Sequence, residues 1–303
     1  MCGIAGIYNF DGAPASPVTV KAMTEAIAHR GPDGEGQFTD GPVALGHRRL
    51  SIIDLSDAAH QPMPSADGRL VITYNGEVYN FQELRIDLEA KGHSFRSRGD
   101  SEVLVTALRE WGDAAVSKFN GMFAFAAWDR AKRRLVIARD RFGVKPVYYW
   151  SDGKTLLFAS EIKAFLKFPG FKAKVNRRNL VEYMTFQNFI SDQTLFEGVR
   201  ILPAGSMLVI EHGMRDVPEP IKYWDFRFVE DSSLTDRAEV EHEVDCLFQQ
   251  AVSRQLISDV PVGSYLSGGM DSGSITAIAA RQRPMIHTFT VGFDMSSASG
   301  IEM

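Results

Sequence analysis

Apolar residues are distributed along the chain in two different ways, which divide it into a strand-rich first part and a more helical second part. In the first part, some segments are apolar almost throughout, as strands buried on both faces are: "GMFAFAAWD", "RLVIARD", "VYYW" and "LLFAS". Others carry apolar residues at helical spacing: "VTVKAMTEAIAHR", "NFQELRIDLEAKG" and "SEVLVTALREWG". The pattern predicts two layers of sheet covered by helices, an α+β domain over residues 2–216.

The second part begins after a stretch that has no periodicity. Residues 217–236 are rich in proline and charge, which predicts a linker. Residues 237–303 begin with a helical pattern, followed by "PVGSYLSGGMDSGSITAIAARQ", which indicates strand, glycine turn and helix, and by the strand "MIHTFTVGF". This order is typical of the start of a parallel α/β sheet. Two strands cannot cover both faces of such a sheet, so we expect this domain to be incomplete at Met303.

Composition and charge exclude several classes of protein. Of the 303 residues, 45% are hydrophobic and 23% are charged, as in ordinary water-soluble proteins, and the length favours two domains. The net charge of −5 argues against nucleic-acid binding. There is no apolar run long enough for a membrane span and no basic flank of a secretory signal. The two cysteines, Cys2 and Cys246, fit a reducing cytoplasm; we expect Cys246 to be a small buried residue of its helix.

Cys2 suggests chemistry at the N-terminus itself. Removal of Met1 would place a thiol and an α-amino group on the same residue. An α-amino group has a pKa of roughly 7.7–8.0 and can act as a base near neutral pH, which a thiol needs to become a thiolate. Cys2 is therefore a candidate N-terminal nucleophile, and the alternative is an accidental cysteine at the second position.

Several motifs extend this interpretation to the whole first domain. "CGIAGI", "RGPDG", "GHRRLSIID", "YNGEVYN" and "RGDSE" occur in this order within residues 2–160. Together they resemble the glutaminase domain of class II glutamine amidotransferases. The resemblance implies a four-layer αββα sandwich, the N-terminal nucleophile fold, in which Cys2 attacks the side-chain amide of glutamine and forms a thioester.

The same resemblance assigns roles to further residues. Asn75 and Gly76 match the oxyanion hole, although "NG" alone is typical of a hairpin turn. Arg49 matches the arginine that holds the α-carboxylate of glutamine, and a guanidinium suits that grip. The α-ammonium is expected to meet Glu77 and Asp100, and for Asp100 a helix cap is the alternative, a role that Ser101 could also take. The backbone at Ile52 and Ile53 is expected to line the glutamine pocket.

The glycine turn of the second domain, "SYLSGGMDSGSI", carries a second candidate site. Backbone N–H groups before a helix bind anions, and the turn is not a Walker loop, because no Gly-Lys-Ser/Thr follows. It resembles the "SGGxDS" pyrophosphate loop of ATP pyrophosphatase domains, which implies an adenine-nucleotide-binding domain. Asp271 is then a candidate for placing Mg²⁺, and the backbone at Leu266 and Val291 for meeting adenosine, unless these two are plain core. The residues implied to hold the ATP pyrophosphate are Ser267, Gly268, Gly269, Asp271 and Ser272.

A class II glutaminase followed by this loop resembles the glutamine-hydrolysing asparagine synthetase family. The resemblance implies that Cys2 releases ammonia from glutamine, that ATP activates aspartate as β-aspartyl-AMP, and that ammonia displaces AMP to form asparagine; it is compatible with a homodimer. If the chain ends at Met303, we expect glutamine hydrolysis without asparagine synthesis. Two alternatives stay open: another carboxylate acceptor, on a sugar or peptide, and a catalytically dead binding module. The intact set of Cys2, Arg49, Asn75, Gly76 and Asp100 argues against the dead module.

Overall fold

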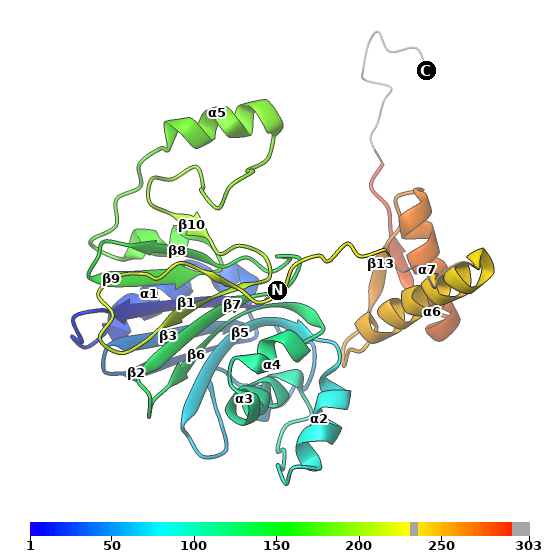
Figure 1. Cartoon of the computed structure of the whole chain (residues 1–303), viewed down its shortest axis with the longest axis horizontal. Coiled ribbons are helices and arrows are strands. Elements are labelled where there is room, and N and C mark those ends of the chain that lie inside the picture. Colours follow the sequence, from blue (N-terminus) through cyan, green and yellow to red (C-terminus); the bar gives the residue numbers. More distant parts are fainter. Residues whose placement is uncertain (231–235, 293–303) are drawn as a thin grey trace. The chain divides into compact units, whose positions relative to one another are not determined.

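A computed structural model of the chain describes residues 1–230 and 236–292 (Figure 1). The chain separates into two compact units, Met1–Arg227 and Phe228–Met303. Parts of two expected segments, residues 231–235 of the linker and 293–303 of the second domain, lie outside the described residues. The two units are described separately below.

The first unit is built on two antiparallel sheets of six strands each. Both sheets mix strands from early and late in the sequence, so their pairing depends on distant parts of the chain. In order across the first sheet the strands are β10 (Arg200–Ile201), β8 (Tyr148–Ser151), β9 (Thr155–Ala159), β1 (Gly3–Asn9), β3 (Val43–Arg49) and β2 (Gly34–Asp40). In order across the second they are β12 (Ile221–Lys222), β11 (Ser206–Ile210), β7 (Arg134–Arg139), β6 (Gly121–Asp129), β5 (Leu70–Val78) and β4 (Met63–Pro64).

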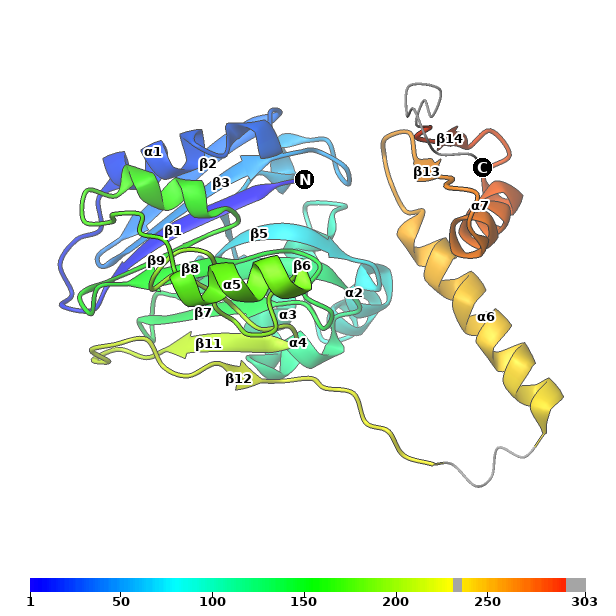
Figure 2. The same cartoon turned by 90° about the horizontal axis from the view of Figure 1, so that it is seen from above.

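Helices cover the outer face of each sheet, which makes four layers (Figure 2). The first sheet is covered by α1 (Pro17–Glu25) and the short helix η3 (Ile162–Lys167). The second is covered by α3 (Asp100–Trp111), against which α2 (Phe81–Glu89) and α4 (Ala114–Lys118) pack. This is the four-layer α+β arrangement that the sequence predicts. Three further helices complete the unit: η1 (Ala28–Arg30), η2 (Asp57–Ala59) and α5 (Arg177–Phe186).

The main core lies where the inner faces of the two sheets meet. Ile4 and Leu45 of the first sheet belong to one buried cluster with Val71 and Trp128 of the second. The continuous apolar runs of the sequence follow from this geometry, since a strand covered on both sides buries every residue. Close packing also requires a glycine in β1, because a Cβ at Gly6 would lie 2.1 Å from the ring of Phe158.

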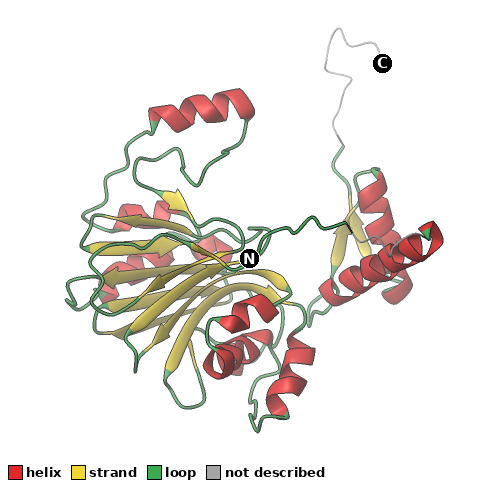
Figure 3. Cartoon of the chain, in the orientation of Figure 1, coloured by secondary structure: helices red, strands yellow, loops and turns green. Residues whose placement is uncertain are grey.

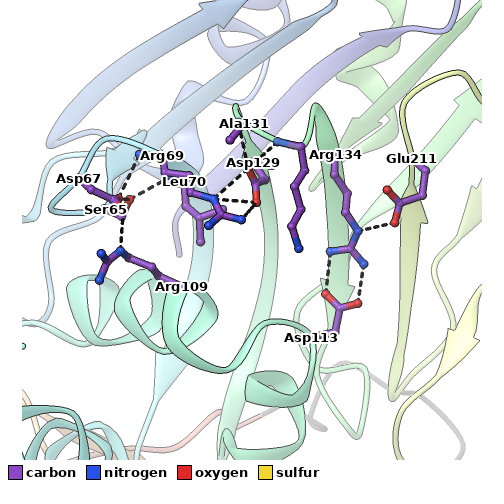
Figure 4. Close-up of polar contacts among 11 residues, drawn as sticks. Ser65, Asp67, Arg69, Leu70, Arg109, Asp113, Asp129, Ala131, Arg134 and Glu211 are labelled. Atoms are coloured by element: carbon purple, nitrogen blue, oxygen red, sulfur yellow. Dashed lines mark hydrogen bonds and ion pairs between the residues drawn. The ribbon is translucent and has the colours of Figure 1, made fainter. Parts of the chain in front are cut away.

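Ion pairs at the rim of the second sheet join strands to the loops around α3 and α4 (Figure 4). Arg134 of β7 donates from Nη1 to Asp113 at 2.8 Å and from Nε to Glu211 at 2.7 Å. Arg69 similarly pairs with Asp129 at 2.8 Å. The side chain of Arg134 is mostly buried at 17% exposure, so its two-carboxylate contact is less screened than an ordinary surface pair.

The second unit contains the elements expected for the start of a parallel sheet (Figure 3). They are α6 (Arg237–Gln255), β13 (Gly263–Tyr265), α7 (Met270–Gln282) and β14 (His287–Phe289), and β13 and β14 pair in parallel. In the part of the chain that is described, no helix is long and apolar enough to cross a membrane.

The prediction that Cys246 is buried is wrong. Its side chain is exposed on α6, with Sγ 3.7 Å from Nε2 of His242. The small core of this unit comprises Val252, Leu256, Ile278 and Ala279. Because that core contacts only the last turns of α6, the middle of the helix, where Cys246 lies, is left uncovered by the other described residues of this unit.

Candidate active site

One cavity of about 190 Å³ in the first unit is lined by all eight residues that the glutaminase resemblance selected. They come from distant parts of the chain: the N-terminus, the end of β3 and the loop after it, β5, and the first turn of α3. The eight are Cys2, Arg49, Ile52, Ile53, Asn75, Gly76, Glu77 and Asp100.

Cys2 lies directly before β1 and is held by its main chain and its thiol. Arg30 donates from Nε to the carbonyl oxygen of Cys2 at 2.8 Å, and the N–H of Leu50 lies 3.3 Å from Sγ. Burial raises the pKa of the Cys2 thiol. Burial also lowers the pKa of the neighbouring N-terminal amine, which in this chain belongs to Met1. The thiol therefore needs a base to ionise, and the amine beside it is in an environment that favours its neutral, basic form.

Asn75 and Gly76 lie inside β5, where they pair with Ala124 and Phe123 of β6. The alternative of a hairpin turn at "NG" is therefore wrong. Gly76 has a φ of +154°, and a Cβ there would lie 2.2 Å from the carbonyl oxygen of Met122. Only glycine fits this position, because both the backbone conformation and the space exclude a side chain.

Past Ile72, one edge of β5 has no described strand beside it, because β4 pairs only with Val71 and Ile72. Side chains satisfy this open edge instead. The N–H of Tyr74 donates to Oε1 of Gln61 at 2.6 Å, and the N–H of Val78 donates to the carboxylate of Asp100 at 2.9 Å.

The N–H of Gly76 faces the same open edge, halfway between those two contacts. In an antiparallel ladder, directly opposed residues alternate between bonded and non-bonded pairs. Phe123, opposite Gly76, uses both its N–H and its carbonyl oxygen with Asp140. Next to Gly76, the side-chain nitrogen Nδ2 of Asn75 is buried and has no hydrogen-bond partner among the described residues. Two N–H donors are thus available at this wall of the cavity.

Two carboxyl groups share the cavity and disfavour each other's ionisation. Burial, and then the neighbouring Asp100, raises the pKa of Glu77 to about 7. Burial also raises the pKa of Asp100, although its carboxylate accepts hydrogen bonds from the hydroxyl of Tyr74 at 2.6 Å and from Val78. A bound cation would relieve both effects.

The alternative role of Asp100 or Ser101 as a helix cap is wrong. Helix α3 begins at Asp100, and its N-cap is Gly99.

Arg49 is buried and its guanidinium is engaged with main-chain carbonyls. It donates from Nη1 to Ser56 at 3.0 Å and from Nη2 to Asp54. Burial tends to raise the pKa of Asp54, but hydrogen bonds from Ser56 and Arg98 outweigh it and lower this pKa to about 2. Arg49 and Asp54 together shape the loop that brings Ile52 and Ile53 to the cavity.

Several further residues line the cavity, although the sequence analysis assigned them no place there; some of them lie inside the motifs. Tyr74 is the first residue of the motif "YNGEVYN", which gives it no role of its own. Gln61 lies between two motifs, and nothing in its spacing indicates that it caps the edge of β5. Lys145 lies far along the chain and is brought in by the tertiary structure alone. The missed lining residues are Met1, Leu50, Ala59, Gln61, Tyr74, Ser101 and Lys145.

In the second unit, the glycine turn forms an exposed loop between β13 and α7. The Oγ of Ser272 accepts from the N–H of Ser267 at 3.1 Å, which folds the turn back on the helix N-terminus. Gly268 has a φ of +82°, and a Cβ there would meet nothing within 4 Å. The N-cap of α7 is Gly269, which has no side chain to accept a hydrogen bond from the first N–H groups of the helix. Open space over backbone N–H groups at a helix N-terminus suits a phosphate group.

The residues proposed to meet adenosine and Mg²⁺ differ in how exposed they are. Leu266 donates its N–H to Phe289 at 2.9 Å and is half-buried, whereas Val291 is 75% exposed, so the core alternative is wrong for Val291. Asp271 lies in the first turn of α7. Within residues 1–230 and 236–292, no group of three or more His, Cys, Asp or Glu residues is placed to hold a metal ion. A single carboxylate is nevertheless compatible with Mg²⁺ that arrives bound to phosphates.

Comparison with known proteins finds two families along the chain. The family described as "Glutamine amidotransferase domain" matches residues 1–224, and the family described as "Asparagine synthase" matches residues 243–302. The glutamine-hydrolyzing asparagine synthetase 3 of Bacillus subtilis is 38% identical over 97% of this chain and 48% of its own length. The glutamine-hydrolyzing asparagine synthetase 1 of the same organism is 36% identical over 100% of this chain and 48% of its own length. The chain thus spans about half the length of the curated relatives it matches.

The fold is shared with a solved structure. Glutamine phosphoribosylpyrophosphate amidotransferase from Bacillus subtilis, complexed with ADP and GMP, has a TM-score of 0.55 and 18% identity, covering 100% of this chain and 71% of that chain. This likeness and the four layers of the first unit confirm the predicted fold class. In this chain, as in its asparagine synthetase relatives, an asparagine synthase segment follows the amidotransferase domain. The chain therefore belongs to the glutamine amidotransferase family.

Proposed function

We propose that the first domain hydrolyses glutamine to glutamate and ammonia, with Cys2 as the nucleophile. One observation carries the proposal: the side-chain nitrogen of Asn75, which has no partner among the described residues, and the N–H of Gly76 share a cavity with the Cys2 thiol. Two preorganised donors next to a nucleophile are what stabilises the oxyanion of an acyl-transfer intermediate.

The reaction then follows from the residues present. After removal of Met1, the α-amine of Cys2 takes the proton of the thiol, and the thiolate attacks the side-chain carbonyl carbon of glutamine. The carbonyl oxygen gains negative charge between Asn75 and Gly76. When the carbon–nitrogen bond breaks, the amine returns the proton and ammonia leaves, with a thioester on Cys2. Water then hydrolyses the thioester to glutamate and restores the thiol.

Glutamine is recognised by its α-groups. Glu77 and Asp100 receive the α-ammonium, which relieves the repulsion between their carboxylates. Arg49 receives the α-carboxylate with the N–H groups that it does not use on the loop. The loop backbone at Ile52 and Ile53 forms the adjoining wall.

For the whole protein we propose asparagine synthesis from aspartate in the cytoplasm, because the relatives matched over this chain are named asparagine synthetases. The names of these relatives do not favour an acceptor other than aspartate. The proposed domains are residues 2–216, the linker 217–236, and residues 237–303 of the synthetase domain. ATP supplies the adenylyl group that activates the acceptor carboxylate. Its pyrophosphate portion would lie on Ser267, Gly268, Gly269 and Ser272, with Asp271 placing Mg²⁺ and Leu266 and Val291 next to adenosine.

The test is glutamate release from glutamine by the chain, compared with its Cys2→Ala variant. We expect release by the wild-type chain and none by the variant, with both folding alike by circular dichroism. Equal release by the two chains would contradict the role of Cys2, and no release by the wild-type chain with Met1 removed would contradict the glutaminase itself.

A further inference from the structure

We propose that His47 is a positioning residue for the glutaminase, which fixes the peptide plane between Tyr74 and Asn75 and so aims the oxyanion donors. This inference rests on the function proposed above. His47 lies on β3, in the opposite sheet, and is not among the residues that line the cavity.

His47 meets the oxyanion strand through one hydrogen bond. Its Nε2 lies 3.0 Å from the carbonyl oxygen of Tyr74, and because a carbonyl oxygen only accepts, Nε2 carries the hydrogen. Burial lowers the pKa of His47 to about 4, so the imidazole is neutral near pH 7. The carbonyl of Tyr74 and the N–H of Asn75 belong to one rigid peptide unit, and the contact therefore orients the start of Asn75 directly.

This peptide lies where β5 has lost its neighbour. The carbonyl of Tyr74 faces the same open edge as its N–H, which Gln61 holds at 2.6 Å. The hydroxyl of Tyr74 is held by Asp100. His47 and Gln61 replace the missing strand, and the residue that they fix is the one directly before the two oxyanion donors.

The choice of histidine at this position is otherwise unfavourable. The other ring nitrogen, Nδ1, is buried and has no hydrogen-bond partner among the described residues. A buried polar atom without a partner destabilises a protein, and an apolar side chain would avoid that loss. Core packing therefore does not explain a histidine at this position, whereas the hydrogen bond from Nε2 to Tyr74 does.

A nearby hydrogen bond offers a matched control. Thr73 donates from Oγ1 to the carbonyl oxygen of Gly46 at 3.1 Å, so it joins the same two strands and is equally buried. It lies one residue further from Asn75 than Tyr74 does, and its hydroxyl donates to Gly46 and not to the Tyr74–Asn75 peptide. Thr73→Val removes a cross-sheet hydrogen bond without disturbing the proposed device.

The experiment compares glutamate release by the wild-type chain and by His47→Met, His47→Gln and Thr73→Val. We expect His47→Met to lower kcat about 10- to 100-fold with little change in KM, because a misplaced donor acts on the transition state. His47→Gln keeps a nitrogen donor at the end of its side chain and should recover most of kcat. Thr73→Val should keep the wild-type kcat even if its melting temperature falls.

Alkylation of Cys2 by iodoacetamide separates positioning from unfolding, because this displacement forms no oxyanion. We expect His47→Met to be alkylated at the wild-type rate despite its low kcat. A wild-type kcat in His47→Met, an equal loss in Thr73→Val, or slowed alkylation in step with kcat would each overturn the inference. A wild-type chain that releases no glutamate would instead overturn the proposed function on which the inference rests.

Discussion

The guanidinium of Arg30 holds the main-chain carbonyl of Cys2, with 2.8 Å between Nε and the oxygen. The same guanidinium pairs through Nη1 with Glu161 at 3.1 Å, and its side chain is only 9% exposed. A residue near the end of a chain is ordinarily mobile. The contact with Arg30, together with those between the thiol and Leu50, ties this end down and restricts the position of Cys2 in the cavity.

Replacement of Arg30 is expected to lower glutaminase activity without large loss of the fold. Arg30→Met removes the hydrogen bond to Cys2, and kcat should fall about 10-fold or more, because the nucleophile loses its orientation. Lys163→Met is the matched control, since Lys163 also pairs with Glu161 but is 46% exposed and makes no contact with Cys2. Steady-state kinetics of both variants check this; equal losses of kcat would contradict it.

Gly76→Ala is expected to destabilise the first unit by about 2 kcal/mol or more, because the side chain overlaps Met122 and the backbone is strained. Chemical denaturation measures the free energy of unfolding. Gly34→Ala is the control: its Cβ would have ordinary contacts, with Arg49 at 3.6 Å, and a small change is expected. A loss in Gly76→Ala no larger than in Gly34→Ala would refute the assigned conformation.

The effect of Glu77 on the stability of the first unit should depend on pH. Its pKa of about 7 in the folded protein exceeds the ordinary value of 4.5, so the folded state binds this proton more tightly and is destabilised when Glu77 ionises. The destabilisation begins as the pH rises above about 4.5 and is complete above about 7. We therefore expect Glu77→Gln to be more stable than the wild-type chain at pH 8 and nearly equal to it at pH 5.

Thermal unfolding at both pH values measures this difference. Glu89→Gln, an exposed substitution on α2, serves as the control and should change the melting temperature by the same small amount at pH 5 and pH 8. A Glu77→Gln effect that is likewise independent of pH would show that the carboxyl of Glu77 is not shifted.

In the second unit, Ser272→Ala is expected to weaken ATP binding about 10-fold, because the loop loses the hydrogen bond that Ser272 accepts from Ser267. Isothermal titration of the chain with MgATP measures the affinity. Ser274→Ala, two residues further along α7, is the control and should bind as the wild-type chain does. Wild-type affinity in Ser272→Ala would argue against the nucleotide role of this loop.

The sequence was sufficient for the class of fold and for eight of the residues that line the cavity. Continuous apolar runs predicted strands buried on both sides. Successive side chains of a strand point to opposite faces, so a run that is apolar throughout indicates that both faces are covered. The motif residues from Cys2 to Asp100 predicted one site, and all eight lie around one cavity. Patterns of this kind are local, or belong to a family, and can be found without coordinates.

The tertiary structure decided what depends on pairing between distant segments. "NG" has the local preference of a turn, but pairing of Asn75 with Ala124 places it within a strand. Cys246 has apolar neighbours in sequence, yet no described element of its own unit packs against its turn of α6. The guanidinium of Arg49 is engaged with the loop carbonyls, which its motif does not indicate. His47 and Gln61 acquire their partners only because β4 ends early beside β5. Hydrogen bonds between strands far apart in the chain form only where the fold places those strands side by side, and the local sequence of one strand does not identify its partner.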